Sequence, residues 1–337
     1  MARTTSYVLL ARMTFWILLA VATAWLLWYM VTVPGASYSG PLKPLSAEET
    51  DLREHLRRHV AAVASREHNV FHFAELEAAA QYLEHALGGL GYRVETQRFK
   101  AAVGEVRNIE VEVKGTARAQ EIIVVGAHYD SVFGAPGAND NGSGVAAVLE
   151  LARLFRGAWP ARTLRFVLFV DEEPPFFKTD QMGSRVYARR AKDRGEKIVA
   201  MFSLETIGYY SDQPGSQHYP FPLGFFYPNT GNFTAFVSNF ASRPLLHEVI
   251  AMFRRHAEFP SEGVTAPAFI PGVDWSDHWS FWKEDYPALM VTDTAPFRYP
   301  HYHAATDTID KVDYERLARV TSGLFKMLRE LAAGEKP

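Results

Sequence analysis

The chain contains no cysteine among its 337 residues. A disulfide framework, a cysteine-ligated zinc finger, an ordinary iron–sulfur cluster and a thiol nucleophile are therefore excluded. The chain also lacks a long run of Lys and Arg, since 35 basic residues stand against 38 acidic ones for a formal net charge of −3. This near-neutral balance argues against a nucleic-acid partner. Any metal site must be built from carboxylates and the 12 histidines.

A hydrophobic share of 48% with 22% charged residues is typical of a globular protein. One stretch differs from the rest, because residues 13–33 contain no charge (MTFWILLAVATAWLLWYMVTV). As a helix it is roughly 30 Å long, which matches a bilayer core. It is longer than the apolar region of a cleaved signal peptide, which spans about 7–15 residues. We predict an uncleaved transmembrane anchor; Val33-Pro34-Gly35-Ala36-Ser37 leaves a cleaved signal peptide as the alternative.

The charges that flank this segment predict its orientation. Arg3 and Arg12 precede it, whereas the first charged residue after it is Lys43. By the positive-inside rule, residues 1–12 form a short cytoplasmic N-terminus and the rest of the chain is extracytoplasmic, or periplasmic in a Gram-negative source. Residues 34–46 are rich in Pro, Gly and Ser, and they predict a juxtamembrane linker.

The remaining residues, 47–337, alternate between strand and helix patterns and predict one large domain. Short apolar runs are typical of strands buried on both faces, and alternating segments are typical of antiparallel or edge strands. The predicted strands are residues 92–99, 108–113, 122–125, 164–170, 198–204 and 288–291, and the predicted helices are residues 52–64, 74–90, 144–155, 184–194 and 314–332. We predict an α/β fold, a three-layer α/β/α sandwich with a mixed, largely parallel central sheet.

Acidic and imidazole side chains follow the buried strands or lie in adjoining loops. These residues are His128, Asp130, Asp140, Glu172, Glu173, Glu205 and His303. Because ligand sites in such sheets lie outside the carboxyl ends of the strands, we expect these side chains to converge. Converging carboxylates repel one another unless cations compensate them, and two divalent metals bridged by one carboxylate would do so. The glycines of residues 137–144 allow a tight loop around Asp140.

In type, order and spacing, these residues resemble the co-catalytic zinc peptidase family that includes bacterial leucine-type aminopeptidases, glutamate carboxypeptidase II and transferrin-receptor ectodomains. The likeness extends roughly from Asn108 to Val312. It implies two Zn²⁺ per chain and a role for each residue. By resemblance, His128 and Glu205 ligate the first zinc, Glu173 and His303 ligate the second, Asp140 bridges both, Glu172 is the general base, and Asp130 orients His128.

The resemblance further implies hydrolysis of peptide bonds, with release of N-terminal residues from a peptide that has a free N-terminus. A zinc-bridging hydroxide attacks the scissile carbonyl in this interpretation, and Glu172 moves the proton to the leaving amine. A carboxypeptidase stays open as an alternative, because the groups that bind a chain terminus form no recognisable motif here.

Two features depart from the commonest aminopeptidase pattern. Glu205 stands where Asp is more frequent, and nine residues, Pro174 to Met182, separate Glu173 from Gly183 where simple aminopeptidases have a shorter link. A longer insertion at this point occurs in glutaminyl cyclases, single-zinc relatives that cyclise N-terminal glutamine, so a cyclase-like acyltransferase is the first alternative. A non-catalytic receptor-like ectodomain is the second. The complete set of expected ligands and the general base favours the peptidase.

Overall fold

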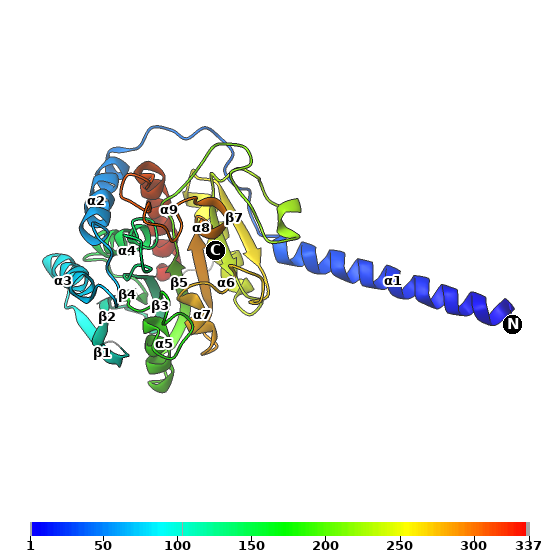
Figure 1. The fold of residues 1–337 in the computed structure, drawn as a ribbon, viewed down its shortest axis with the longest axis horizontal. Coiled ribbons are helices and arrows are strands. Elements are labelled where there is room, and N and C mark those ends of the chain that lie inside the picture. The colour runs from blue at the N-terminus through cyan, green and yellow to red at the C-terminus, as the bar shows by residue number, and fades with distance from the viewer. Residues whose placement is uncertain (1, 103, 335–337) are drawn as a thin grey trace.

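The computed structural model describes residues 2–102 and 104–334, so Met1 and the last three residues of the predicted 47–337 domain lie outside the described residues. Figure 1 shows the arrangement of the elements. In chain order they are α1 (Ala2–Val31), α2 (Ala47–Val63), α3 (Phe73–Gly89), β1 (Glu95–Ala101), β2 (Gly104–Val113), β3 (Arg118–His128), α4 (Gly142–Leu154), β4 (Arg162–Phe169), α5 (Gly183–Asp193), β5 (Lys197–Leu204), the 3-10 helix η1 (Leu223–Phe225), β6 (Thr234–Ser238), α6 (Arg243–His256), β7 (Ser261–Thr265), α7 (His278–Trp282), β8 (Ala288–Thr292), α8 (Ala295–Arg298) and α9 (Tyr314–Ala333).

An eight-stranded sheet with the order β1-β2-β4-β3-β5-β8-β6-β7 forms the centre of the domain. β3 runs parallel to β4 and β5, β5 runs parallel to β8, and β6 runs parallel to β7. The β1–β2, β2–β4 and β6–β8 pairs are antiparallel. The predicted mixed sheet with a parallel centre is confirmed, and so are the antiparallel strands at the β1 edge.

Two apolar layers cover the faces of the central strands. In β3, Ile123 and Val125 face the larger core, whereas Ile122 and Val124 face a second core shared with α5 and α7. Helices α4, α6 and α9 cover the first face, and α2 packs outside α4 and α9. This alternation follows from the pleat of a strand, and burial on both faces explains the continuous apolar runs in the sequence. The three-layer α/β/α prediction is confirmed.

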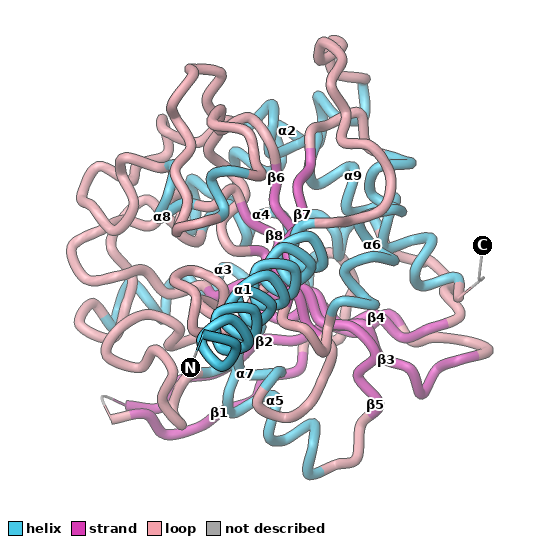
Figure 2. Tube along the Cα trace, turned by 90° about the vertical axis from the view of Figure 1, so that its right-hand side faces the viewer, coloured by secondary structure: helices cyan, strands magenta, loops and turns pink. Residues whose placement is uncertain are grey.

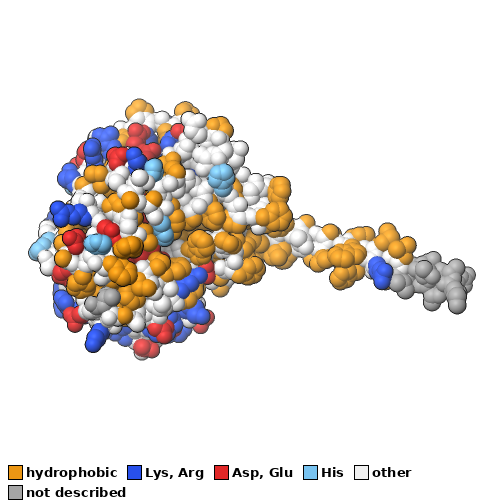
Figure 3. Space-filling model, in the orientation of Figure 1, with side chains coloured by type: hydrophobic (Ala, Val, Ile, Leu, Met, Phe, Trp, Pro, Cys, Tyr) orange, Lys and Arg blue, Asp and Glu red, His pale blue; other side chains and the backbone are white. Residues whose placement is uncertain are grey.

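Helix α1 extends away from the domain (Figure 1) and is seen nearly along its axis in Figure 2. Its residues Leu9–Val31 form a span of 23 residues that is long and apolar enough to cross a membrane. Figure 3 shows hydrophobic side chains along the exposed helix and around its base. The last turn is packed against the domain, where Met30 is buried beside Val237 and Ala266. The structure therefore contains one N-terminal apolar helix in the expected place, and its base is part of the domain.

The segment between β5 and β8 contains elements that the sequence patterns do not predict. β6 and β7 pair with each other, and β6 joins them to the sheet by pairing antiparallel with β8. Helix α6 packs on β6, β7 and α9. The sheet is consequently wider than predicted, and α1 contacts it at β7.

Candidate metal centre

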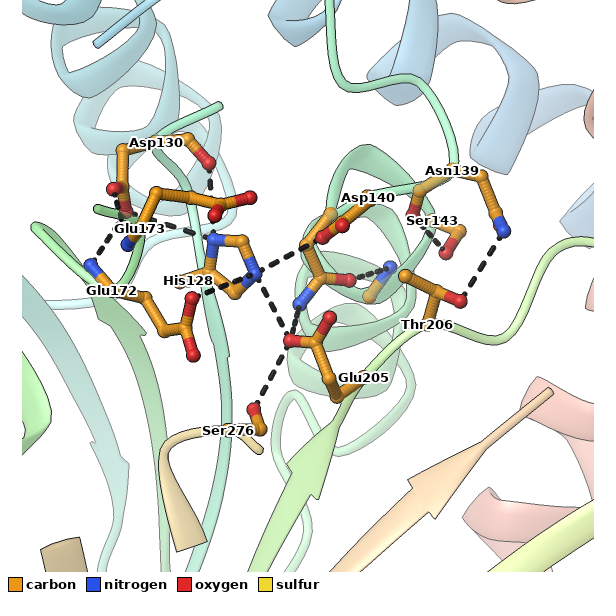
Figure 4. Close-up of polar contacts among 12 residues, drawn as sticks. His128, Asp130, Asn139, Asp140, Ser143, Glu172, Glu173, Glu205, Thr206 and Ser276 are labelled. Atoms are coloured by element: carbon orange, nitrogen blue, oxygen red, sulfur yellow. Dashed lines mark hydrogen bonds and ion pairs between the residues drawn. The ribbon is translucent and has the colours of Figure 1, made fainter. Parts of the chain in front are cut away.

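The predicted site residues meet at one edge of the sheet. His128 is the last residue of β3, Glu172 and Glu173 follow β4, and Glu205 follows β5. Because β4, β3 and β5 are adjacent and parallel, their carboxyl ends bring these side chains together (Figure 4). Asp140 reaches the same place from the loop before α4. The expected convergence of acidic and imidazole groups is present.

Asp140 lies between two separate pairs of side chains. Its Oδ1 is 3.3 Å from His128 Nε2, and the same nitrogen is 2.9 Å from Glu205 Oε2. Its Oδ2 is 3.1 Å from Nε2 of His303, a residue of the loop between α8 and α9. That nitrogen is in turn 3.3 Å from Glu173 Oε1. One carboxylate therefore faces two His–Glu pairs, one with each oxygen.

The atoms at the centre of this arrangement are buried and have few hydrogen bonds. His128 is 0% exposed, Asp140 2% and Glu173 4%. His128 Nε2, both carboxylate oxygens of Asp140 and Glu173 Oε1 have no hydrogen-bond partner. A buried polar atom left without a partner costs about 1–3 kcal/mol, and a bound ion would remove that cost by supplying the missing partner. Imidazole nitrogens and carboxylate oxygens are ligands that suit Zn²⁺, so the donor set fits a metal.

The electrostatics of the centre also fit a site for cations. The pKa of Glu205 is raised to about 8 and the pKa of Glu173 to about 7, chiefly by burial, with the charge of Asp140 as a further cause in both. Burial opposes ionisation of Asp140, but contacts with His128 and His303 hold the pKa of Asp140 well below its ordinary value. Three carboxylates in one buried place can all ionise only when cations lie among them.

Glu172 points into the same space without belonging to either His–Glu pair. Its Oε2 is 3.9 Å from His128 Nε2, farther than the corresponding oxygens of Asp140 and Glu205. Burial raises the pKa of Glu172 well above its ordinary value, and the neighbouring glutamates add to the effect. Glu172 is therefore a buried carboxylate next to the pairs, with its charge disfavoured in the absence of cations.

Asp130 fixes the turn that carries the two adjacent glutamates. Its carboxylate oxygens accept the backbone N–H groups of Glu172 and Glu173 at 3.1 and 3.0 Å (Figure 4). Its backbone carbonyl is 3.0 Å from His128 Nδ1, whereas its Oδ1 lies 3.6 Å from that nitrogen. Because a carbonyl can only accept, His128 carries a proton on Nδ1, which leaves Nε2, the nitrogen that faces Asp140, as the ring atom that could ligate a metal.

Two side chains outside the predicted ligand set hold Glu205 in place. Ser276 Oγ donates to Glu205 Oε2 at 3.0 Å (Figure 4). Asn141 Nδ2 donates to the same oxygen at 3.0 Å. Asn141 is also the N-cap of α4, since its Oδ1 accepts the backbone N–H of Gly144. The preference of Asn for N-caps was an available signal for Asn141. Ser276 comes from the loop between β7 and α7.

The loop around Asp140 is fixed by backbone contacts. Gly137 adopts a φ of +72°, and a Cβ atom there would lie 2.6 Å from the carbonyl oxygen of Asp140. A Cβ atom at Gly144 would lie 2.3 Å from the carbonyl oxygen of Leu204. Asp307 accepts the backbone N–H of Asp140 at 3.0 Å. The expectation that glycines permit this tight loop is met at Gly137 and Gly144.

An apolar cavity lies beside Glu205. Its lining includes Tyr219, Leu223, Tyr227, Val264, Val273 and Met290. The aromatic stretch after β5 thus contributes to a cavity that reaches the cluster of carboxylates. Phe176, from the nine-residue link after Glu173, is instead buried in the larger core, so packing accounts for that side chain.

A second His–Glu group, His55 and His59 of α2 with Glu150 of α4, also has spacing that could hold a metal. Its carboxylate is already satisfied, because Glu150 Oε1 is 3.2 Å from His59 Nε2 and Oε2 accepts from Arg153 Nε at 2.7 Å. A buried carboxylate with partners on both oxygens needs no cation. This distinguishes the group from the centre around Asp140, where both oxygens lack a hydrogen bond.

The chain matches the model of Peptidase family M28 over residues 108–328. It belongs to peptidase family M28. The predicted membership of a metal-dependent peptidase family is thereby confirmed, and with it the expectation that the chain is an enzyme. The matched residues run from β2 into α9 and include every residue of the centre around Asp140.

Curated relatives cover most of the chain. The uncharacterized protein YfbL of Escherichia coli (strain K12) is 38% identical over 262 residues, which are 75% of this chain and 80% of that protein. The probable leucine aminopeptidase 1 of Trichophyton verrucosum (strain HKI 0517) is 25% identical over 329 residues, which are 90% of this chain and 81% of that protein. The matched parts cover about four fifths of each relative.

Solved structures share the fold at low sequence identity. BSAP, a zinc aminopeptidase from Bacillus subtilis, superposes with a TM-score of 0.66 at 16% identity, covering 88% of this chain and 98% of that chain. The glutaminyl cyclase of Fimbriiglobus ruber superposes with a TM-score of 0.61 at 19% identity, covering 88% of this chain and 99% of that chain. The M28 fold is thus common to proteins with both names.

Proposed function

We propose that this member of family M28 is a two-zinc aminopeptidase. The observation that carries the proposal is Asp140, whose two oxygens face different His–Glu pairs and have no hydrogen-bond partner. One zinc would be held by Asp140, His128 and Glu205, and the other by Asp140, Glu173 and His303. In each set the three ligand atoms lie within 4.8 Å of one another. Two divalent cations here would compensate the clustered carboxylates.

The chemistry divides between the metals and Glu172. Zn²⁺ bound by these residues supplies a Lewis acid that polarises the scissile carbonyl and activates water. Glu172, which is in neither ligand set, accepts the proton of the attacking water and delivers it to the departing amine. Asp130 positions Glu172 and Glu173 by holding both backbone N–H groups, and it orients His128 through its carbonyl. The two adjacent glutamates can therefore serve as base and ligand respectively.

Release of the N-terminal residue is favoured by the relatives and by the apolar cavity. A relative named leucine aminopeptidase matches over 90% of this chain. The cavity beside Glu205, lined by Leu223, Val264 and Met290 among others, suits the side chain of an apolar residue next to the scissile bond. We infer a peptide with a free, apolar N-terminal residue as the substrate.

A single-zinc glutaminyl cyclase is the alternative that a specific observation keeps open, since a protein with that name shares the fold. The arrangement around Asp140 favours two metals, because one metal would leave a buried oxygen of Asp140 without a partner. A receptor-like ectodomain is disfavoured for a similar reason. A buried cluster of ligand atoms without hydrogen bonds is costly to keep when no metal binds.

We further propose that α1 is an uncleaved single-pass anchor, with the N-terminus in the cytoplasm and the domain on the other side of the membrane. The apolar span ends at Val31, and Trp25, Trp28 and Tyr29 lie near this end, as aromatic residues do at membrane interfaces. Arg12 lies near the opposite end of the helix, which supports the orientation.

Metal analysis combined with a substrate panel tests the proposed activity. The full chain would be purified in lipid nanodiscs, its zinc content measured, and its action followed on peptides with free, acetylated or glutaminyl N-termini. We expect two zinc ions per chain, stepwise release of residues from free N-termini only, and loss of activity after chelation that added Zn²⁺ restores. One zinc per chain with pyroglutamate formation would show that the protein is a cyclase. Release of residues from the C-terminus would show that it is a carboxypeptidase. Absence of metal and turnover would support the receptor-like alternative.

Ser276→Ala is expected to weaken zinc binding at the set that contains Glu205 by about 10–100-fold, the usual cost of removing a hydrogen bond to a metal ligand. The reason is that Ser276 Oγ donates to Glu205 Oε2 at 3.0 Å. Zinc titration against a competing chelator measures the change. Ser280→Ala is the matched control, since Ser280 is also buried but bonds to Ser184. Equal losses in both variants would show that the Ser276 contact has no special role.

A further inference from the structure

The base of α1 is joined to the domain without a free spacer. Met30 is 4% exposed and is buried in a cluster with residues of β6, β8 and the loop after β7. Val33 packs against Gly263 of β7, where an added Cβ atom would lie 2.9 Å from Val33 Cγ1. Arg254 of α6 donates to the carbonyls of Pro34 at 3.0 Å and Gly35 at 2.7 Å. The first residues after the helix are therefore held on the domain surface, and the domain cannot move far from the end of the helix.

Aromatic and basic side chains cluster where α1 meets the domain. The Arg243 guanidinium lies 3.8 Å from the centroid of the Tyr29 ring, and Arg243 Nε donates to the Tyr29 carbonyl. The Tyr29 ring stacks on Trp25 at 5.4 Å and on Phe240 at 6.2 Å. Aromatic rings mixed with basic groups are typical of the level where a bilayer meets water. If α1 spans a membrane, this level coincides with the surface of the domain.

Exposed phenylalanines flank this junction. Phe221 and Phe269 are each 86% exposed and Phe225 is 79% exposed. Together with Phe226 and Phe240 they are called here the aromatic surface. Figure 3 shows hydrophobic side chains gathered around the base of α1, whereas most charged side chains in this view lie toward the other side of the domain.

Two loops that carry all of the aromatic surface except Phe240 are tied to the base of α1. The loop of residues 219–227 is held by Tyr227, whose hydroxyl donates to the Gly263 carbonyl of β7 at 2.7 Å. The loop after β7 carries Phe269 next to Ile270, which packs in the same cluster as Met30. The position of both loops relative to the helix is therefore set by the fold, and they stay at the level where α1 ends.

We propose that the aromatic surface inserts into the interface of the same bilayer that α1 crosses, so that the domain lies directly on the membrane. The inference rests on the proposed anchoring by α1. Lipid is the occupant that the structure favours, because the exposed rings are continuous with an apolar helix and are held at its interfacial end. Large exposed apolar patches mark partner or membrane contacts, and aromatic side chains are well suited to the headgroup boundary.

This placement defines a class of substrate. Tyr219 and Leu223 of one Phe-bearing loop, and Pro271 and Trp275 of the other, line the apolar cavity that reaches Glu205. The cavity therefore lies between the two loops that contact lipid. Peptides that lie on the bilayer, or emerge from it with an apolar N-terminus close to the headgroups, are the substrates that can reach this cavity most directly.

Single cysteine labels test the contact, because the chain has no cysteine of its own. Phe221→Cys, Phe269→Cys, Phe71→Cys and Trp25→Cys would each be made in the full chain, labelled with an environment-sensitive fluorophore and placed in nanodiscs. Some lipids would carry a nitroxide quencher near the headgroup. Phe71 is the matched control, since it is 59% exposed and precedes α3, which lies on the opposite side of the domain from α1 (Figure 1). Trp25 lies in α1 and reports the anchor itself.

The labels at positions 221 and 269 are expected to be quenched several-fold more strongly than the label at 71, and their emission to shift to shorter wavelength. Quenching at 25 together with signals at 221 and 269 that equal the one at 71 would overturn the lipid contact and leave the anchor in place. A label at 25 that is not quenched would overturn both. None of these readouts depends on turnover, so they are separate from the test of aminopeptidase activity.

Discussion

Glu172→Gln is expected to lower kcat by about 10²–10⁴-fold, the usual contribution of a general base, while the zinc content stays unchanged. The substitution keeps the shape of the side chain and removes only its ability to accept a proton. Glu172 Oε2 is 3.9 Å from His128 Nε2, whereas the nearer Glu205 oxygen is at 2.9 Å, and Glu172 belongs to neither of the two proposed zinc ligand sets. Steady-state kinetics on a peptide with a free N-terminus and metal analysis of the same sample measure both quantities.

Glu105→Gln provides the control, because Glu105 is an exposed glutamate of β2 that pairs at 3.1 Å with Arg98 of the edge strand β1. It should leave both activity and zinc content unaltered. Full activity in Glu172→Gln would remove Glu172 as the base. Loss of zinc in the Glu172→Gln variant would instead show that Glu172 is a zinc ligand.

The second large effect is expected from Asp140→Asn, which should release both metals and abolish measurable turnover. Removing the shared charge leaves each set with one histidine and one glutamate, and a neutral amide is a poor bridge between two cations. The loss in zinc affinity should exceed the about 10–100-fold that follows from removing an outer hydrogen-bond partner. Isothermal titration of the metal-free variant with Zn²⁺, and zinc content after dialysis, provide the measurement.

His303→Ala is the comparison that makes this test specific. His303 contacts Asp140 Oδ2 and Glu173 but neither His128 nor Glu205. Its removal should release one zinc and retain the other. If Asp140→Asn and His303→Ala keep the same amount of zinc, Asp140 serves one metal only and the bridged arrangement is wrong.

The parallel centre of the sheet could be predicted from sequence because its strands are buried on both faces. Runs such as Ile122 to Val125 are apolar at every position, which separates them from half-exposed strands. β6 and β7 could not be predicted in this way. Each of these strands has only five residues, and β7 contains Ser261, Gly263 and Thr265, which are not typical of a buried strand. β7 is therefore defined by its pairing with β6 rather than by its composition. The helical spacing of Leu246, Val249, Ile250 and Phe253 was a usable signal for α6.

The convergence of the site residues could be predicted because most of them follow parallel strands. The position of one strand end then fixes the positions of the neighbouring strand ends. This reasoning applies to His128, Glu173 and Glu205. The groups that support them are different. Ser276 contacts Glu205 across 71 positions of sequence, and Asp307 holds the backbone of Asp140 from 167 positions away. Such contacts depend on how loops pack at the sheet edge, and no periodicity in the sequence encodes them.

The two faces of Asp140 have a thermodynamic consequence. Two metal sites that share one carboxylate cannot fill independently, because the first ion changes the charge that the second one meets. This coupling is reciprocal, so the factor by which one ion alters the affinity of the other is the same in both directions. In the proposed two-zinc centre, repulsion between neighbouring cations would make the second ion bind more weakly than the first, and a singly loaded enzyme would be populated when zinc is scarce. If activity requires both of the proposed zinc ions, the availability of zinc sets how much of the protein is active.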